Sequence, residues 1–239
     1  MAASHISLTL ARFDTLQTAG PLQDLGAGGV LFQAVGSDAR AAGTGFKELS
    51  AYKFVLLGLH DSLESAVQQH ETREEVAPWI VGAKEVWSGV LVPVRHFGSA
   101  NFLDPAAPGP LYDCPPETDP TGRFAVVTTA GFNPSDDLPD RARRFGDGVN
   151  AVRINMFGTP GLLSTQSFFL EGGIALDGIT VTFWNSFAEM RDAIYGPGTH
   201  KDWMARQRAE SLADRTSFTR CLVERSTGTW YGADPFRAE

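Results

Sequence analysis

Residues 56–67, LLGLHDSLESAV, are matched in arrangement by residues 180–191, TVTFWNSFAEMR. Each segment begins with an apolar stretch of strand length, continues with a polar pair and ends in a helical pattern. The polar pairs contain Ser62 and Ser186, and serine oxygens often accept hydrogen bonds from the first free amides of a helix. We therefore predict a strand, a cap and a helix in both places, with the two serines as caps and not as nucleophiles.

The match between the two halves of the chain extends well beyond these segments. The same offset places Trp79 opposite Trp203, and apolar strand patterns at 89–94 and 218–224 follow the two tryptophans. Two further pairs of predicted strands lie upstream: HISLTLARF with GRFAVVTTAGF, and GGVLFQAVGS (28–37) with GVNAVRINMFG (148–158). Each half is predicted to run β-α-β-β-α-β. The expected fold class is α+β, with tandem ferredoxin-like repeats that form a pseudo-dimeric α/β barrel.

A proline-rich segment divides the chain. Residues 99–122 hold six of the 14 prolines and follow neither hydrophobic period, which is typical of a linker or a long surface loop. We therefore predict a first ferredoxin-like half at 1–98, a linker at 99–122 and a second half at 123–239.

Composition limits the classes of function. The net charge of −8 and the pI of about 5.1 argue against nucleic-acid binding, because no basic stripe is present. No apolar run is long enough for a membrane span, and the segment MAASHISLTLARF does not resemble a leader, so a cytoplasmic protein is expected. Sixteen phenylalanines are enough to line an apolar pocket, so the composition allows a hydrophobic small-molecule ligand. The sequence leaves open whether the chain forms a homo-oligomer.

His200 is the strongest candidate for a metal ligand. It follows the breaker Gly196-Pro197-Gly198, and the first half has Val76 at the matching position. Thr199 through Asp202 fit a capping pattern, so we expect Thr199 to be the N-cap and His200 to lie in the first helical turn. The positive end of the helix dipole disfavours imidazolium and keeps a nitrogen lone pair available to a metal.

The neighbours of His200 at helical spacing are Trp203, Met204 and Gln207, which predict a mostly apolar face. An imidazole on an apolar wall suits the proximal side of a haem, whereas the other histidines lack the spacing of a multi-ligand metal site. The alternative without a metal is that His200 is solvated or caps the helix. Arg153 and Ser167, in or beside strand patterns of the second half, are weaker candidates for polar groups that reach a ligand.

Several segments together resemble the spheroidene monooxygenase family of carotenoid-modifying enzymes. They are GTGF (43–46), FVLLGLHDSLESA, the glycine-rich break before His200 and the closing STGTWYGADPF (226–236). The resemblance implies a duplicated ferredoxin-like barrel, haem b, and oxygenation of a hydrophobic polyene with dioxygen and an external electron donor. It also implies that His200 is the proximal iron ligand. The proline lies three residues before the histidine instead of one, so the substrate does not follow from the resemblance.

The leading hypothesis is a haem-dependent monooxygenase in which His200 binds iron and Trp203 and Met204 wall the proximal side. Arg153 and Ser167 would then act as catalytic polar groups on the other side. Haem folds of this kind are also similar to aldoxime dehydratases, so a lyase acting on an N–O substrate is an alternative. A non-catalytic haem-binding module is a third.

Overall fold

A computed structural model describes residues 2–18, 30–37, 49–98, 112–114, 121–170 and 178–237. The eight strands are β1 (His5–Arg12), β2 (Val30–Ser37), β3 (Leu49–His60), β4 (Glu85–Gly98), β5 (Phe124–Gly131), β6 (Leu162–Leu170), β7 (Gly178–Trp184) and β8 (Arg215–Gly228). The helices are α1 (Leu63–Glu71), α2 (Arg73–Val76), the 3-10 helix η1 (Pro78–Gly82), α3 (Leu138–Met156), α4 (Phe187–Tyr195) and α5 (Thr199–Glu210).

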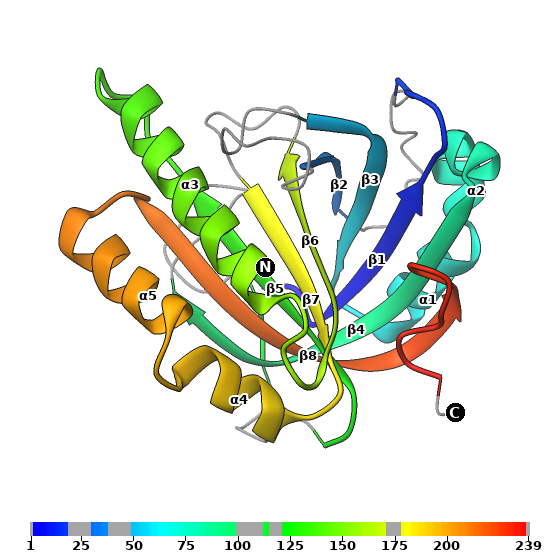
Figure 1. Ribbon diagram of the computed structural model, residues 1–239. Helices are drawn as coiled ribbons and strands as arrows, with labels where there is room; N and C mark the ends of the chain where they lie inside the picture. Colours follow the sequence, from blue (N-terminus) through cyan, green and yellow to red (C-terminus); the bar gives the residue numbers. More distant parts are fainter. Residues whose placement is uncertain are drawn as a thin grey trace.

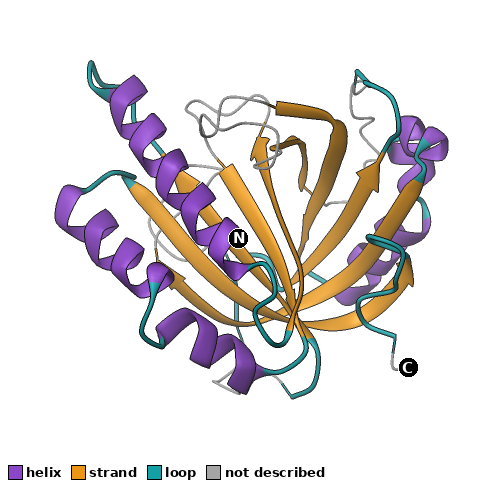
Figure 2. Cartoon of the chain, viewed as in Figure 1, coloured by secondary structure: helices purple, strands orange, loops and turns teal. Residues whose placement is uncertain are grey.

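The strands form one closed antiparallel barrel in the order β1-β3-β2-β6-β7-β5-β8-β4. The helices lie outside it in two groups: α1 and α2 flank one side, and α3, α4 and α5 gather on the other (Figure 1). Figure 2 shows the sheet as a single curved layer between these groups. The predicted α+β barrel is therefore confirmed at the level of a closed eight-stranded sheet.

The barrel has two junctions between the halves of the chain, and they differ in length. Strands β4 and β8 pair from Trp87 opposite Gly228 to Gly98 opposite Ser217, whereas the described pairing of β2 with β6 runs from Ala34 opposite Leu170 to Ser37 opposite Ser167. Within the halves the strand orders are β4-β1-β3-β2 and β8-β5-β7-β6. Corresponding strands thus occupy corresponding places.

Alternation along the strands separates two kinds of core. One face of every strand points into the barrel, and the buried cluster there includes Leu8, Leu57, Trp87, Val127 and Phe183. The opposite face is covered by the helices. In the first half this cover is tightly packed by Leu56, Val76, Ala77 and Ile80.

Both predicted serine caps are confirmed. The Ser62 hydroxyl accepts a hydrogen bond from the Ser65 amide at 3.3 Å, and the Ser186 hydroxyl accepts one from the Glu189 amide at 3.3 Å. The helices α1 and α4 begin directly after these residues. The strand-to-helix units around both segments therefore form as the sequence indicates.

The predicted strand at 148–158 is wrong, because the long helix α3 continues through it to Met156. Val149, Val152 and Met156 fall on one helical face, and that face covers the sheet. The second strand of this half is instead β6. A predicted helix between β1 and β2, most of the proline-rich segment and the GTGF stretch lie outside the described residues.

Candidate functional site

A cavity of about 980 Å³ lies between α3, α4, α5 and the sheet of the second half, and it extends to the nearby end of the barrel. Its volume falls at the upper end of the usual range for small-molecule sites. Its wall is largely apolar; representative members are Val126, Phe145, Val152, Met156, Ile194 and Phe218. Because the matching face of the first half is closed by packed side chains, the two halves differ here.

The break between α4 and α5 positions His200. Helix α4 ends at Tyr195, and Gly198 adopts φ of +142°, a backbone conformation that residues with a Cβ atom rarely adopt. Helix α5 begins at Thr199 with Gly198 as the N-cap, so the prediction of Thr199 as N-cap is wrong by one position. His200 does lie in the first turn, and its side chain lines the cavity.

A backbone carbonyl fixes the tautomer of His200. The Nδ1–H donates to the carbonyl oxygen of Ile194 at 3.1 Å, since a carbonyl can only accept. The Nε2 atom, which has no hydrogen-bond partner among the described residues, therefore keeps its lone pair. Burial lowers the pKa of His200, and the bond to Ile194 partly opposes this effect. The imidazole is thus neutral at pH 7, the state that a metal ligand requires.

The donor set is a single imidazole. Within the described ranges no group of three or more His, Cys, Asp or Glu side chains could hold a metal ion. A metal held by His200 would therefore need most of its ligands from a cofactor, as the porphyrin supplies them in haem.

Trp203, Met204 and Gln207 line the same cavity as His200, as their helical spacing predicts. The Trp203 ring stands edge-on to Phe145 of α3, with ring centroids 5.6 Å apart. It also fills the space beside Gly148, where an added Cβ would come within 2.2 Å of the ring. This close contact places α5 against α3 above the sheet.

Arg153 and Ser167 occupy different positions from each other. Arg153 lies in α3, not in a strand, is 5% exposed and lines the cavity. Ser167 is buried in β6, and its hydroxyl lies 2.7 Å from the hydroxyl of Thr180, which does line the cavity. Ser167 itself is not part of the wall, so its contact with the cavity is indirect.

Thr165 is a polar wall residue that sequence reasoning missed. It is 5% exposed, lines the cavity, and its hydroxyl has no hydrogen-bond partner among the described residues. The signal that could have found it is the period of two along β6, which puts Thr165 and Ser167 on one face. A buried hydroxyl without a partner is free to bond a ligand.

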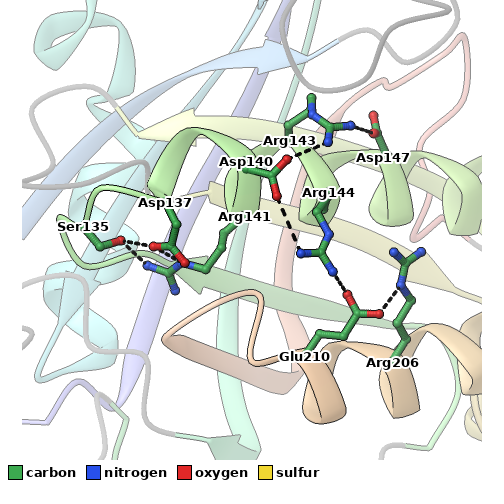
Figure 3. A network of polar contacts seen from close by, with 9 residues as sticks. All are labelled: Ser135, Asp137, Asp140, Arg141, Arg143, Arg144, Asp147, Arg206 and Glu210. Carbon is green, nitrogen blue, oxygen red and sulfur yellow. Dashed lines mark hydrogen bonds and ion pairs between the residues drawn. The ribbon is translucent and has the colours of Figure 1, made fainter.

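Charged side chains join α3 to α5 at the surface beside the cavity (Figure 3). Glu210 of α5 pairs with Arg144 of α3 and, at 2.8 Å, with Arg206 of its own helix. Arg144 also lies 3.6 Å from Asp140. This network connects the first part of α3 to the last turn of α5.

Comparison with models of known protein families and with curated proteins gives no match. Among solved structures, an aldoxime dehydratase in complex with butyraldoxime has a TM-score of 0.52 at 11% identity, over 92% of this chain and 79% of that chain. The two share a fold. At this level of identity the likeness says nothing of activity.

Two solved proteins assigned as monooxygenases, from Fusobacterium nucleatum and Lactobacillus acidophilus, have TM-scores of 0.41 and 0.39. Their identities are 9% and 8%, with 98% and 94% of this chain and 97% and 96% of theirs covered. These scores are too low to support an argument. No described helix is long and apolar enough to cross a membrane.

Proposed function

We propose that this protein is a haem-dependent monooxygenase acting on a hydrophobic small molecule. The observation that carries the proposal is the state of His200: Nδ1–H is held by the Ile194 carbonyl while Nε2 keeps its lone pair beside a large apolar cavity. A histidine that binds a metal through one ring nitrogen usually donates the N–H of its other ring nitrogen to a carbonyl or carboxylate oxygen or to water.

The residues fit haem b. One imidazole, an apolar wall and a cavity of about 980 Å³ suit a cofactor that brings its own equatorial ligands. When bound, haem would supply the activation of dioxygen, with electrons from an external donor.

The roles of the chain's own residues follow from their positions. His200 would hold the iron through Nε2, and Trp203 and Met204 would pack against the same side of the cofactor. Arg153 and Thr165 would donate hydrogen bonds to a bound polar group, and Ser167 would orient the Thr180 hydroxyl from behind the wall. The apolar lining would exclude water from the reacting groups.

A second candidate is a haem-dependent lyase that removes water from an N–O substrate such as an aldoxime. An aldoxime dehydratase has the same fold, and the neutral imidazole of His200 beside the apolar cavity would serve this reaction as well. In this reaction Arg153 and Thr165 would bond the leaving oxygen of the substrate. No net electron is consumed, so neither dioxygen nor a stoichiometric reductant is required.

The first test is a set of absorption spectra of the protein reconstituted with haemin: oxidised, reduced, and reduced with carbon monoxide. We expect a Soret band that shifts with carbon monoxide in the wild type, and its loss or displacement in His200→Ala. His5→Ala is the control, because His5 lies in β1 and does not line the cavity. An unchanged spectrum in His200→Ala, or no haem binding by the wild type, would overturn the assignment.

The two enzyme candidates separate in a second experiment. A monooxygenase turns over only with both dioxygen and reductant, whereas the lyase converts an aldoxime without oxygen or net reductant consumption. Six-coordinate iron with two protein ligands, whose absorption spectrum no substrate changes, would instead indicate a non-catalytic haem-binding module.

Two finer features belong to the proposal. The equal strand orders of the halves support an origin by duplication of a ferredoxin-like unit, with residues 1–98 and 123–239 as the two units. We also place the protein in the cytoplasm, where a soluble donor would supply its electrons.

A further inference from the structure

The charged side chains that line the cavity are all positive. The chain carries a net charge of −8, yet the cavity wall has three arginines, Arg143, Arg153 and Arg208, besides His200. Among the described wall residues no aspartate or glutamate is present. An apolar cavity with a cationic wall in an acidic protein favours a ligand that carries negative charge.

Two of the arginines share one end of the cavity. Helices α3 and α5 run in opposite directions, because Gly148 contacts Trp203 while Arg144 pairs with Glu210. The start of α3 therefore lies beside the end of α5, which brings Arg143 and Arg208 to the same end. His200 lies eight residues before Arg208, about 12 Å along the helix.

The two arginines at this end differ in how far their charge is compensated. The guanidinium of Arg143 lies 2.7 Å from Asp140 and 3.2 Å from Asp147. Arg208 is exposed at the rim and forms no ion pair with a described residue. The uncompensated positive charge of the cavity mouth is thus that of Arg208.

We propose that Arg208, with Arg143 beside it, binds the carboxylate end of the cavity's ligand, whose apolar body extends toward His200. This inference rests on the proposed function for the identity of the ligand. The carboxylate belongs either to the propionates of haem or to an amphipathic substrate such as a long-chain carboxylic acid. A planar guanidinium suits both, because it donates two parallel hydrogen bonds to one carboxylate.

The experiment compares haemin with haemin dimethyl ester, which lacks the negative charges, in wild type, Arg208→Ala and Arg208→Lys. Arg206→Ala is the matched control, since Arg206 lies in the same helix, pairs with Glu210 and does not line the cavity. We expect Arg208→Ala to weaken haemin binding roughly fivefold, as for an exposed ion pair, with the ester unaffected. Arg208→Lys should recover part of the loss, and Arg206→Ala should bind both forms like the wild type.

A second arm compares palmitate with hexadecanol by calorimetry on the same proteins without haemin. A preference for palmitate that Arg208→Ala removes would assign the carboxylate to a substrate, and it would stand even if the protein bound no haem and the proposed function failed. A haemin effect without a palmitate effect would assign it to the propionates. If Arg208→Ala changes the affinity of neither anionic ligand relative to its neutral partner, the inference is overturned.

Discussion

His60 and His200 are both partly or fully buried histidines, but their ring nitrogens are used differently. In His60, Nε2 lies 2.9 Å from the Ser7 hydroxyl and Nδ1 lies 2.8 Å from the Ser65 hydroxyl, so both nitrogens are occupied. In His200 only Nδ1 is occupied. The first ring joins α1 to the sheet, whereas the second has a nitrogen available to a ligand.

His60 makes the stability of the protein depend on pH. Burial lowers its pKa to about 4, against about 6.5 in an unfolded chain. Between these values the unfolded chain binds a proton that the folded protein does not, so stability is full above pH 6.5 and declines as the pH falls toward 4. We expect the urea midpoint to fall over this window, and to fall less in His60→Gln.

The other histidines with lowered pKa contribute to the same decline, so His60→Gln should reduce the slope without removing it. Urea titrations of both proteins at pH 7, 5.5 and 4.5 measure this slope. If the urea midpoint fell equally with pH in wild type and His60→Gln, His60 would not be a source of the pH dependence.

At the scale of elements, the packing of α3 on α5 determines the shape of the cavity. Trp203 lies against both Phe145 and Gly148, so the two helices approach closely only because position 148 has no side chain. In an exposed helix, glycine to alanine would stabilise the protein by up to about 1 kcal/mol. Here the added methyl group meets the large, partly buried ring of Trp203.

We therefore expect Gly148→Ala to destabilise the protein by about 1–3 kcal/mol, the usual cost of overpacking, and to weaken haemin binding by displacing Trp203. Gly82→Ala is the control, because an added Cβ at Gly82 meets no atom within 4 Å. Thermal unfolding and haemin titration measure both effects. If Gly148→Ala were more stable than the wild type and bound haemin equally well, the contact between Gly148 and Trp203 would not determine how closely α3 and α5 pack.

The same elements show what the sequence could predict. The caps at Ser62 and Ser186 and the position of His200 follow from local hydrogen bonding, so they were predictable from short segments. The segment 148–158 was misjudged because its Val, Ile and Phe residues suggest a strand, while its apolar spacing is helical. Arg208 was missed, although it lies two turns after His200 on the same face of α5. Its role as a cavity residue depends on the packing of α3 beside α5, and no local sequence pattern predicts that packing.

At the scale of the whole molecule, the barrel is held closed by two unequal junctions. The β4–β8 junction extends over most of two 14-residue strands, whereas among the described residues the β2–β6 junction pairs Ala34–Ser37 with Ser167–Leu170 and no others. Each paired residue contributes to the cost of separation, so the shorter junction should open more readily.

Amide hydrogen exchange tests this difference. We expect the amides that pair β2 with β6 to exchange at least tenfold faster than the central amides that pair β4 with β8, which corresponds to about 1.4 kcal/mol in opening free energy. The amides between β5 and β7 serve as an internal reference within one half. Equal protection at both junctions would mean that the barrel opens only as a whole.

The long β4–β8 junction also bears on how the chain is made. Strand β4 ends at Gly98, but its partner β8 begins only at Arg215, so on the ribosome the first half is synthesised long before this edge can be covered. An uncovered strand of this length is a template for pairing with other nascent chains. We therefore expect the chain to be most exposed to such pairing in the interval before β8 emerges, and slow translation of the second half would lengthen that interval.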